Sequence, residues 1–88
     1  MSYRVAGHVY HRAVDDEVVV FDGRTETYLG LNTTAAIVWT ALAAGSSVGA
    51  AADALEARTG ISPDLARADA IALATDLVER GLLEPTAG

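Results

Sequence analysis

The sequence predicts an α+β fold in which a three-stranded antiparallel sheet is followed by three helices. The composition changes at Leu31-Asn32. Before this point valine, tyrosine and threonine are frequent, and these residues favour strands. After it the chain is rich in alanine, leucine and acidic residues, and alanine is the strongest helix former. Strands grouped ahead of helices are typical of α+β proteins, whereas parallel α/β sheets alternate the two.

Turn signals divide the first part of the chain into strands. The acidic run at residues 15–17 marks one turn, and Asp22-Gly23 marks the next. An Asp-Gly pair between strand-like runs predicts a tight hairpin, because the primed turns need positive φ angles. We therefore expect strands within residues 3–13, at 17–21 and at 25–31.

Pairing across the Asp-Gly turn divides the side chains between two faces of the sheet. One face carries Val18, Val20, Thr25, Thr27 and Leu29. The other carries Glu17, Val19, Phe21, Glu26 and Tyr28. We expect the first face to pack against the helices, because it holds no acidic residue and continues in register to Leu31.

The first two helices have capping residues at both ends. Asn32 is a good N-cap for the first helix, and Gly45 is placed to end it in a left-handed turn. Ser46 or Ser47 caps the second helix, which stops at Gly60.

The third helix begins at Ser62-Pro63-Asp64, which supplies a capping hydroxyl, a proline at the first helical position and an acid at the positive helix end. It runs to Arg80, with Gly81 as its stop.

One broad apolar arc of the third helix consists of Ala66, Ala70, Leu73, Ala74, Leu77 and Val78. Asp69, Asp76 and Arg80 lie at its edge beside Leu73. Core packing with a solvated acidic rim is the simplest interpretation. The alanine side chains on this arc are small, so this helix can approach a sheet edge closely and still leave space for a bound ligand.

Length and composition limit the classes of function. A chain of 88 residues predicts one domain over residues 1–88, and the absence of cysteine excludes disulfides and thiolate metal sites. Twelve acidic residues against six arginines give a net charge of −6, which disfavours nucleic acid and anionic membranes. The longest nearly apolar run, residues 35–44, is about half of what crosses a bilayer, and the N-terminus does not resemble a signal peptide. We expect a soluble cytoplasmic protein.

No set of residues predicts catalysis. The serines at helix starts are explained as caps, and none lies in a Gly-x-Ser-x-Gly elbow. Strand alternation is expected to send His8 and His11 to opposite faces of the first strand, so a shared metal ion would need a bulge. No glycine loop cradles phosphate and the chain has no lysine. We expect no catalytic residue, no metal and no cofactor.

The edge of the third strand is the candidate binding site. This strand ends a short meander, so its outer edge presents unpaired backbone groups unless the first strand covers it. An open edge promotes aggregation unless it is covered or used. Its use would be to accept a peptide as an added strand.

The stretch Tyr28-Leu-Gly-Leu-Asn-Thr-Thr-Ala-Ala-Ile-Val-Trp39 resembles the signature of PqqD-type proteins. These are the peptide-recognition domains of ribosomal-peptide modification pathways, known as RiPP recognition elements. The order of elements, the length and the late Leu77-Val-Glu-Arg-Gly-Leu-Leu83 agree with that family, so the resemblance covers nearly the whole chain.

The resemblance implies a winged-helix-like fold that binds the leader part of a precursor peptide as an extra strand between the third strand and the third helix. Stand-alone proteins of this size resemble those of lasso-peptide pathways, where the leader passes to a cysteine-protease-like leader peptidase. PqqD-like chaperones instead present a peptide to a radical-SAM enzyme.

Mapped onto this sequence, one wall of the peptide site is Thr25, Glu26, Thr27, Tyr28, Leu29 and Gly30. Leu73, Asp69 and Asp76 form the other wall, and Val18 and Val20 form the floor. The acidic rim would favour a basic leader, mainly through on-rate and selectivity.

Two other classes of function remain open. A winged-helix DNA-binding domain is one, although the third helix sets Arg67 and Arg80 against four acidic residues, and a recognition helix should not be net acidic. A structural subunit is the other. Val19, Phe21 and Tyr28 would then form a contact with another copy or with the processing enzyme.

Overall fold

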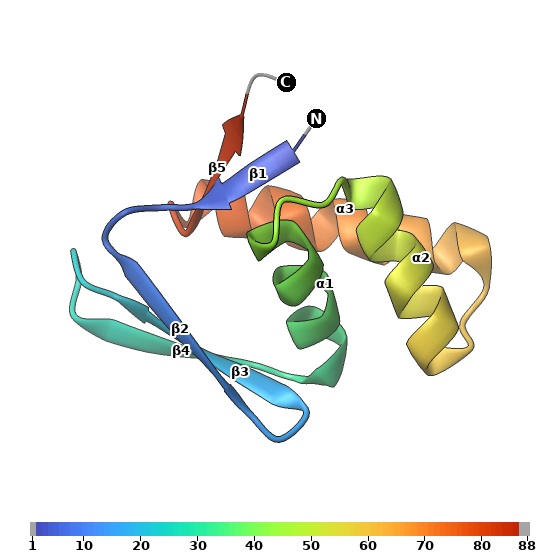
Figure 1. The fold of residues 1–88 in the computed structure, drawn as a ribbon, viewed down its shortest axis with the longest axis horizontal. Coiled ribbons are helices and arrows are strands. Elements are labelled where there is room, and N and C mark those ends of the chain that lie inside the picture. The colour runs from blue at the N-terminus through green and yellow to red at the C-terminus, as the bar shows by residue number, and fades with distance from the viewer. Residues whose placement is uncertain (1, 87–88) are drawn as a thin grey trace.

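The computed structural model describes residues 2–86 and confirms the predicted α+β class (Figure 1). The elements are β1 (Ser2–Val5), β2 (Val9–Val14), β3 (Glu17–Asp22), β4 (Thr27–Leu31), α1 (Thr33–Ala43), α2 (Val48–Thr59), α3 (Pro63–Glu79) and β5 (Leu83–Thr86). Strands β2, β3 and β4 form the expected antiparallel sheet in that order, and three helices follow it. A second sheet of two strands, β1 and β5, was not predicted.

The first predicted strand, within residues 3–13, is two strands that belong to different sheets. β1 pairs antiparallel with β5, which places Ser2 opposite Thr86, and β2 pairs with β3. Between them the backbone N–H of the buried Ala6 donates to the Leu82 carbonyl at 3.1 Å. The prediction of a single strand was wrong because the partner of β1 lies at the other end of the chain, where pairing leaves no local signal in the sequence.

The turn between β3 and β4 also differs from the prediction. β3 continues to Asp22, residues 23–26 form a loop, and the positive φ angle falls at Glu26 rather than at Gly23. Gly23 is required for another reason, since its N–H donates to the His8 carbonyl at 2.8 Å and a Cβ there would lie 2.9 Å from that oxygen. Thr25 and Glu26 therefore both lie in the loop and not on a strand.

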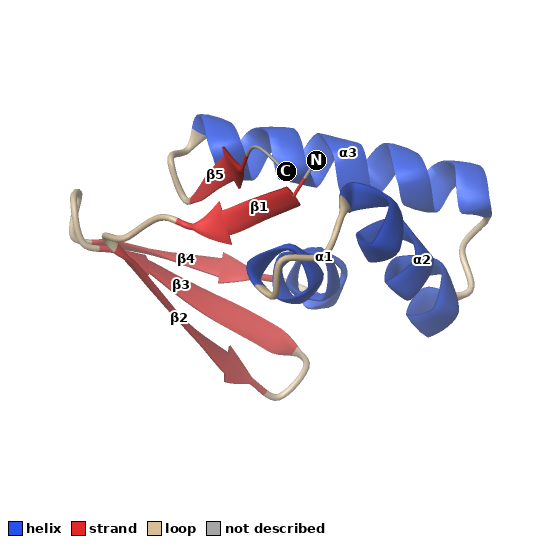
Figure 2. Cartoon of the chain, turned by 45° about the horizontal axis from the view of Figure 1, so that its top comes forward, coloured by secondary structure: helices blue, strands red, loops and turns tan. Residues whose placement is uncertain are grey.

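The predicted faces of the sheet are confirmed for the residues that lie on its strands, which leaves out Thr25 and Glu26. Val18 pairs with Leu31 and Val20 with Leu29, and this face is buried against the helices. Figure 2 shows the helices on one side of the sheet. Tyr28 lies on the opposite face and is 75% exposed. The largest fully buried side chains are Trp39, Leu42, Leu55, Leu77, Leu83, Val20 and Val38.

The helix ends follow the predicted signals. Asn32 Oδ1 accepts the N–H of Ala35 at 3.0 Å, and the hydroxyls of Ser47 and Ser62 accept the N–H three residues on at 3.1 and 3.3 Å. These contacts satisfy donors that the first turn of a helix leaves unpaired. Positive φ angles follow each helix, at Gly45 (92°), Gly60 (73°) and Gly81 (75°).

The core contact of α3 can be tested with a pair of variants. Leu77 is 1% exposed, so Leu77→Ala should lower the free energy of unfolding by about 2–5 kcal/mol through lost burial and a residual cavity. Ile71, on the same helix, is 50% exposed, and Ile71→Ala should change it by about 0.5 kcal/mol or less. Urea denaturation followed by circular dichroism measures both, and equal losses would contradict this packing.

Candidate functional site

The outer edge of β4 is open in the part of the chain that the structure describes. The sheet order β2-β3-β4 places β3 in the centre, so β4 is bonded along one edge and pairs with no strand along the other. The sequence left open whether the first strand covers this edge, and the structure shows that it does not, because β2 pairs with the far edge of β3.

Two cavities lie along β4, one toward each end of the strand. The first, of about 340 Å³, separates the end of β4 and the start of α1 from α3, and is lined by Gly30, Leu31, Asn32, Thr34, Ala35, Asp69, Ala72 and Leu73. The second, of about 240 Å³, lies at the start of β4 and the end of α3, and is lined by Val20, Asp22, Thr27, Tyr28, Leu29, Arg80 and Leu82. We call the two cavities together the β4–α3 groove.

Most of the predicted site residues border this groove. Those that line it are Val20, Thr27, Tyr28, Leu29, Gly30, Asp69 and Leu73. Thr25 and Glu26 lie in the loop before β4, because the strand begins two residues later than expected. Val18 is buried opposite Leu31 and lines neither cavity, so the structure does not place it on the floor of the groove.

Sequence reasoning missed several groove residues. Asp22 and Arg80 lie at one end of the groove, and Ala72 lies at the other. Ala72 follows Asp69 by three positions, so helical spacing could have placed the two on one side of α3. Asp22 carried no such signal, because the sequence indicated only a turn there.

The acidic rim is weaker than the sequence indicated. Arg80 Nε donates to Asp76 Oδ2 at 2.9 Å, one helical turn apart, and both side chains are half exposed. This pair offsets the charge of Asp76, which lines neither cavity. Two carboxylates line the groove, Asp69 and Asp22, and Asp22 is largely buried and accepts the backbone N–H of Arg24. Attraction of a basic ligand would therefore depend chiefly on Asp69.

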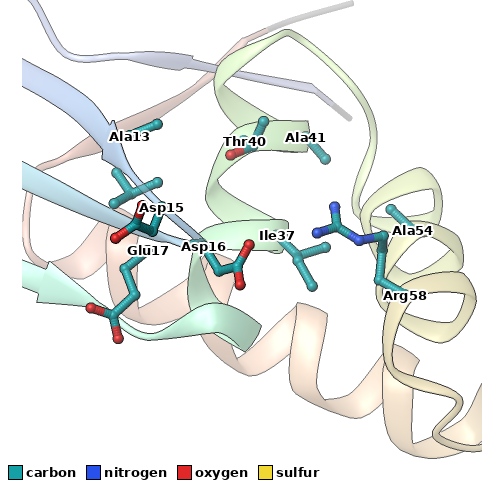
Figure 3. A pocket seen from close by; sticks show the side chains of 11 residues that line it. Ala13, Asp15, Asp16, Glu17, Ile37, Thr40, Ala41, Ala54 and Arg58 are labelled. Carbon is teal, nitrogen blue, oxygen red and sulfur yellow. The ribbon is translucent and has the colours of Figure 1, made fainter.

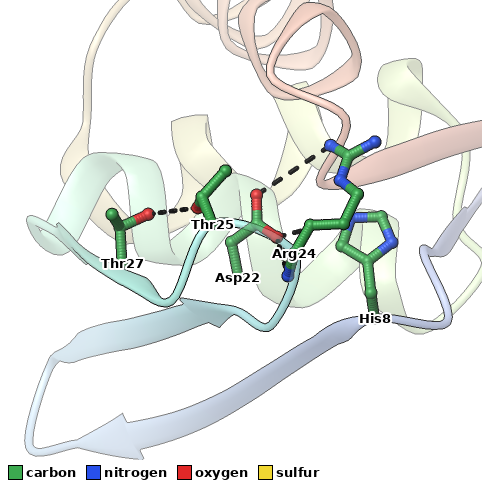
Figure 4. A network of polar contacts seen from close by, with 5 residues as sticks. All are labelled: His8, Asp22, Arg24, Thr25 and Thr27. Atoms are coloured by element: carbon green, nitrogen blue, oxygen red, sulfur yellow. Dashed lines mark hydrogen bonds and ion pairs between the residues drawn. The ribbon is translucent and has the colours of Figure 1, made fainter.

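A polar network holds the loop at the start of β4 (Figure 4). Asp22 is 8% exposed, and its Oδ1 accepts the backbone N–H of Arg24 at 2.9 Å. Its Oδ2 lies 3.9 Å from Arg24 Nη2, and His8 Nε2 lies 3.6 Å from Oδ1. The hydroxyls of Thr25 and Thr27 are 2.6 Å apart. Thr25 thus braces the first residue of β4 and does not line the groove.

Another hollow, of about 280 Å³, lies on the other side of α1 (Figure 3). The acidic turn between β2 and β3 forms one side, with Asp15 and Asp16, and Arg58 of α2 faces it from the opposite side. The described residues form no ion pair across it. Val18 lines this hollow.

Other kinds of site find no support among the described residues. Within residues 2–86 no group of three or more His, Cys, Asp or Glu side chains could hold a metal ion. In the same stretch, every helix is too short or too polar to reach across a bilayer.

Comparisons with known proteins agree with the geometry. The family model described as coenzyme PQQ synthesis protein D (PqqD) matches residues 17–83, which include β3, β4 and all three helices. A structure of TbiB1 in complex with the TbiA(beta) leader peptide has 27% sequence identity and a TM-score of 0.85, covering 97% of this chain and 99% of that one. A lasso peptide synthetase B1 complexed with the leader peptide has 30% identity and a TM-score of 0.85, covering 97% and 100%. No curated protein matches the chain.

The open edge predicts a pattern of amide exchange in the free protein. Amides of the central strand β3 should exchange slowly, because both its edges are bonded. The amides of β4 that point away from β3 should exchange fast. Hydrogen exchange followed by NMR measures this, and uniform protection along β4 would mean that the edge is covered.

Proposed function

Because this chain belongs to the PqqD family and is a PqqD-like RiPP recognition element, we propose that it binds the leader segment of a ribosomally made precursor peptide and catalyses no reaction itself. The observation that carries the proposal is the unpaired edge of β4 beside two cavities against α3. Both similar structures contain a leader peptide, which supports it further.

The leader is bound as a fourth strand along β4. Backbone hydrogen bonds to an open strand give affinity without regard to sequence, and side-chain cavities give specificity. Side chains of an added strand alternate between the two faces of the sheet. Those on the same face as Leu29 and Leu31 point into the β4–α3 groove.

The cavities suggest which leader side chains are accepted. The cavity beside Leu73 and Ala72 has apolar side chains from α3 and favours an aliphatic or aromatic anchor. Asp69 lines the same cavity and favours a basic leader residue next to that anchor, mainly by increasing the on-rate.

The bound leader is then delivered to another protein. In a lasso-peptide pathway that protein is a cysteine-protease-like leader peptidase, and the similarity to a lasso peptide synthetase B1 favours this branch. Delivery to a radical-SAM enzyme, as by a PqqD-like chaperone, is the alternative, and the PqqD family match fits both. Delivery takes place in the cytoplasm, where precursor peptides are made. Leader cleavage that speeds up when this chain is added to peptidase and precursor would distinguish the first branch.

Titration tests leader binding directly. The probe is a fluorescein-labelled synthetic leader of the precursor peptide encoded beside this gene, with a scrambled peptide of the same composition as the control. We expect saturable binding at micromolar concentrations for the leader alone, measured by fluorescence anisotropy. Equal binding of both peptides, or no saturation, would refute the proposed function.

The groove can be tested with two matched arginine variants of α3. Leu73 lines the groove and Ile71 lies half exposed outside it. Leu73→Arg should weaken leader binding by about tenfold or more, because a charge replaces an apolar contact in the cavity. Ile71→Arg should leave the affinity unchanged. Circular dichroism checks that both variants fold, and equal affinities would show that the leader binds elsewhere.

A further inference from the structure

The outer face of the sheet carries a row of three aromatic side chains that none of the described helices covers. Tyr10, Phe21 and Tyr28 lie opposite one another on β2, β3 and β4. The ring centroids of Tyr10 and Phe21 are 6.5 Å apart, and those of Phe21 and Tyr28 are 4.8 Å apart. Tyr10 is 68% exposed and Tyr28 is 75% exposed. Together with Val14 and Val19 these rings line an open cavity of about 430 Å³.

The neighbouring row of the same face ends in a gap. Arg12, Val19 and Gly30 lie opposite one another, and Val19 is only partly buried. A Cβ placed on Gly30 would meet nothing within 4 Å. Strand β4 therefore has a position without a side chain, at Gly30, beside the exposed ring of Tyr28 and on the face that points away from the helices.

We propose that the leader strand carries an aromatic or large aliphatic side chain opposite Gly30 on this outer face, where it packs over Gly30 and against Tyr28 and Val19. The inference rests on the proposed addition of the leader to β4. Directly opposed residues on neighbouring strands have Cβ atoms about 4.5–5.5 Å apart, and diagonal neighbours remain within reach of aromatic side chains. A large side chain opposite an edge glycine compensates for the missing side chain, as designed sheets show.

The leader therefore binds through both of its faces. Side chains on one face enter the β4–α3 groove, and a side chain on the other extends the apolar outer face by one strand. A leader that is apolar only on its inner face would leave Tyr28 and the gap at Gly30 exposed to water.

A second copy of this chain is a poorer occupant of the outer face. Three strands spaced about 4.8 Å apart and five or six residues long present a footprint of roughly 300 Å². A stable protein–protein contact needs about 800 Å² on each partner. One or two side chains of an added strand match the size of the gap better than a protein surface does.

Tyr28→Ser and Tyr10→Ser form a matched pair of variants. Both tyrosines are exposed, and both rings lie near Phe21, but Tyr28 lies on β4, the strand proposed to receive the leader, whereas Tyr10 lies on β2 at the opposite edge of the sheet. With the fluorescein-labelled leader of the neighbouring precursor, Tyr28→Ser should raise Kd about threefold to tenfold, since aromatic cross-strand contacts contribute in this range. Tyr10→Ser should leave Kd unchanged.

A size exchange tests the gap itself. Gly30→Phe should weaken binding of the native leader, because the new ring occupies the space proposed for the leader side chain; the φ angle of Gly30 is not positive, so the backbone tolerates the change. A set of synthetic leaders, each with one residue replaced by alanine, locates the leader side chain concerned. One of these leaders should bind Gly30→Phe more tightly than the native leader does, because alanine removes the side chain that the new ring displaces. Thermal melts verify that each variant folds.

The outcomes separate this inference from the proposed function. Failure of the unmodified protein to bind the leader would refute both. If the unmodified protein binds and Tyr28→Ser has no effect, or if Tyr10→Ser weakens binding equally, the outer contact is wrong and strand addition stands. If Gly30→Phe binds the native leader as well as the unmodified protein does, the proposed place of the side chain is likewise wrong.

Discussion

The pairing of β3 with β4 is the constraint on which the rest of the structure depends. Val20 is fully buried opposite Leu29, and Val18 is buried opposite Leu31, so the inner face of the sheet is fixed against the helices. A shift of one residue would turn the valines to water and the intervening side chains to the core. The same register decides which atoms of β4 face the groove, and it leaves Tyr28 and Gly30 on the outer face.

Local signals in the sequence predicted the helices well. Asn32 and Ser62 cap the helices that follow them through hydrogen bonds to residues three positions later. Each helix start can therefore be recognised from a few neighbouring residues. The strand turns were harder. The loop after Asp22 depends on a carboxylate buried near His8, a residue fourteen positions earlier, and no local pattern encodes that contact. The β1–β5 pairing is more distant still and was missed for the same reason.

The candidate site was predictable only where it coincides with simple periodicity. Leu73 and Asp69 line the β4–α3 groove, as expected from their shared side of a helix, and Leu29 lines it as expected from its alternation along a strand. Val18 alternates in the same way, yet it faces a different hollow, since α1 lies between that hollow and the groove. A strand predicts which face a residue occupies, and only the packed helices decide which cavity lies under it.

The β1–β5 ribbon has a consequence for how such a fold can be built into larger assemblies. Ser2 and Thr86 lie opposite each other with their hydroxyl oxygens 2.6 Å apart, so the two ends of the described chain leave the structure side by side (Figure 1). They do so from a sheet that does not include β4. A fold with adjacent ends can be inserted into a surface loop of a host protein, because the two host residues that it joins can stay close together. Insertion at this ribbon would transplant the recognition surface into an enzyme and leave the edge of β4 free.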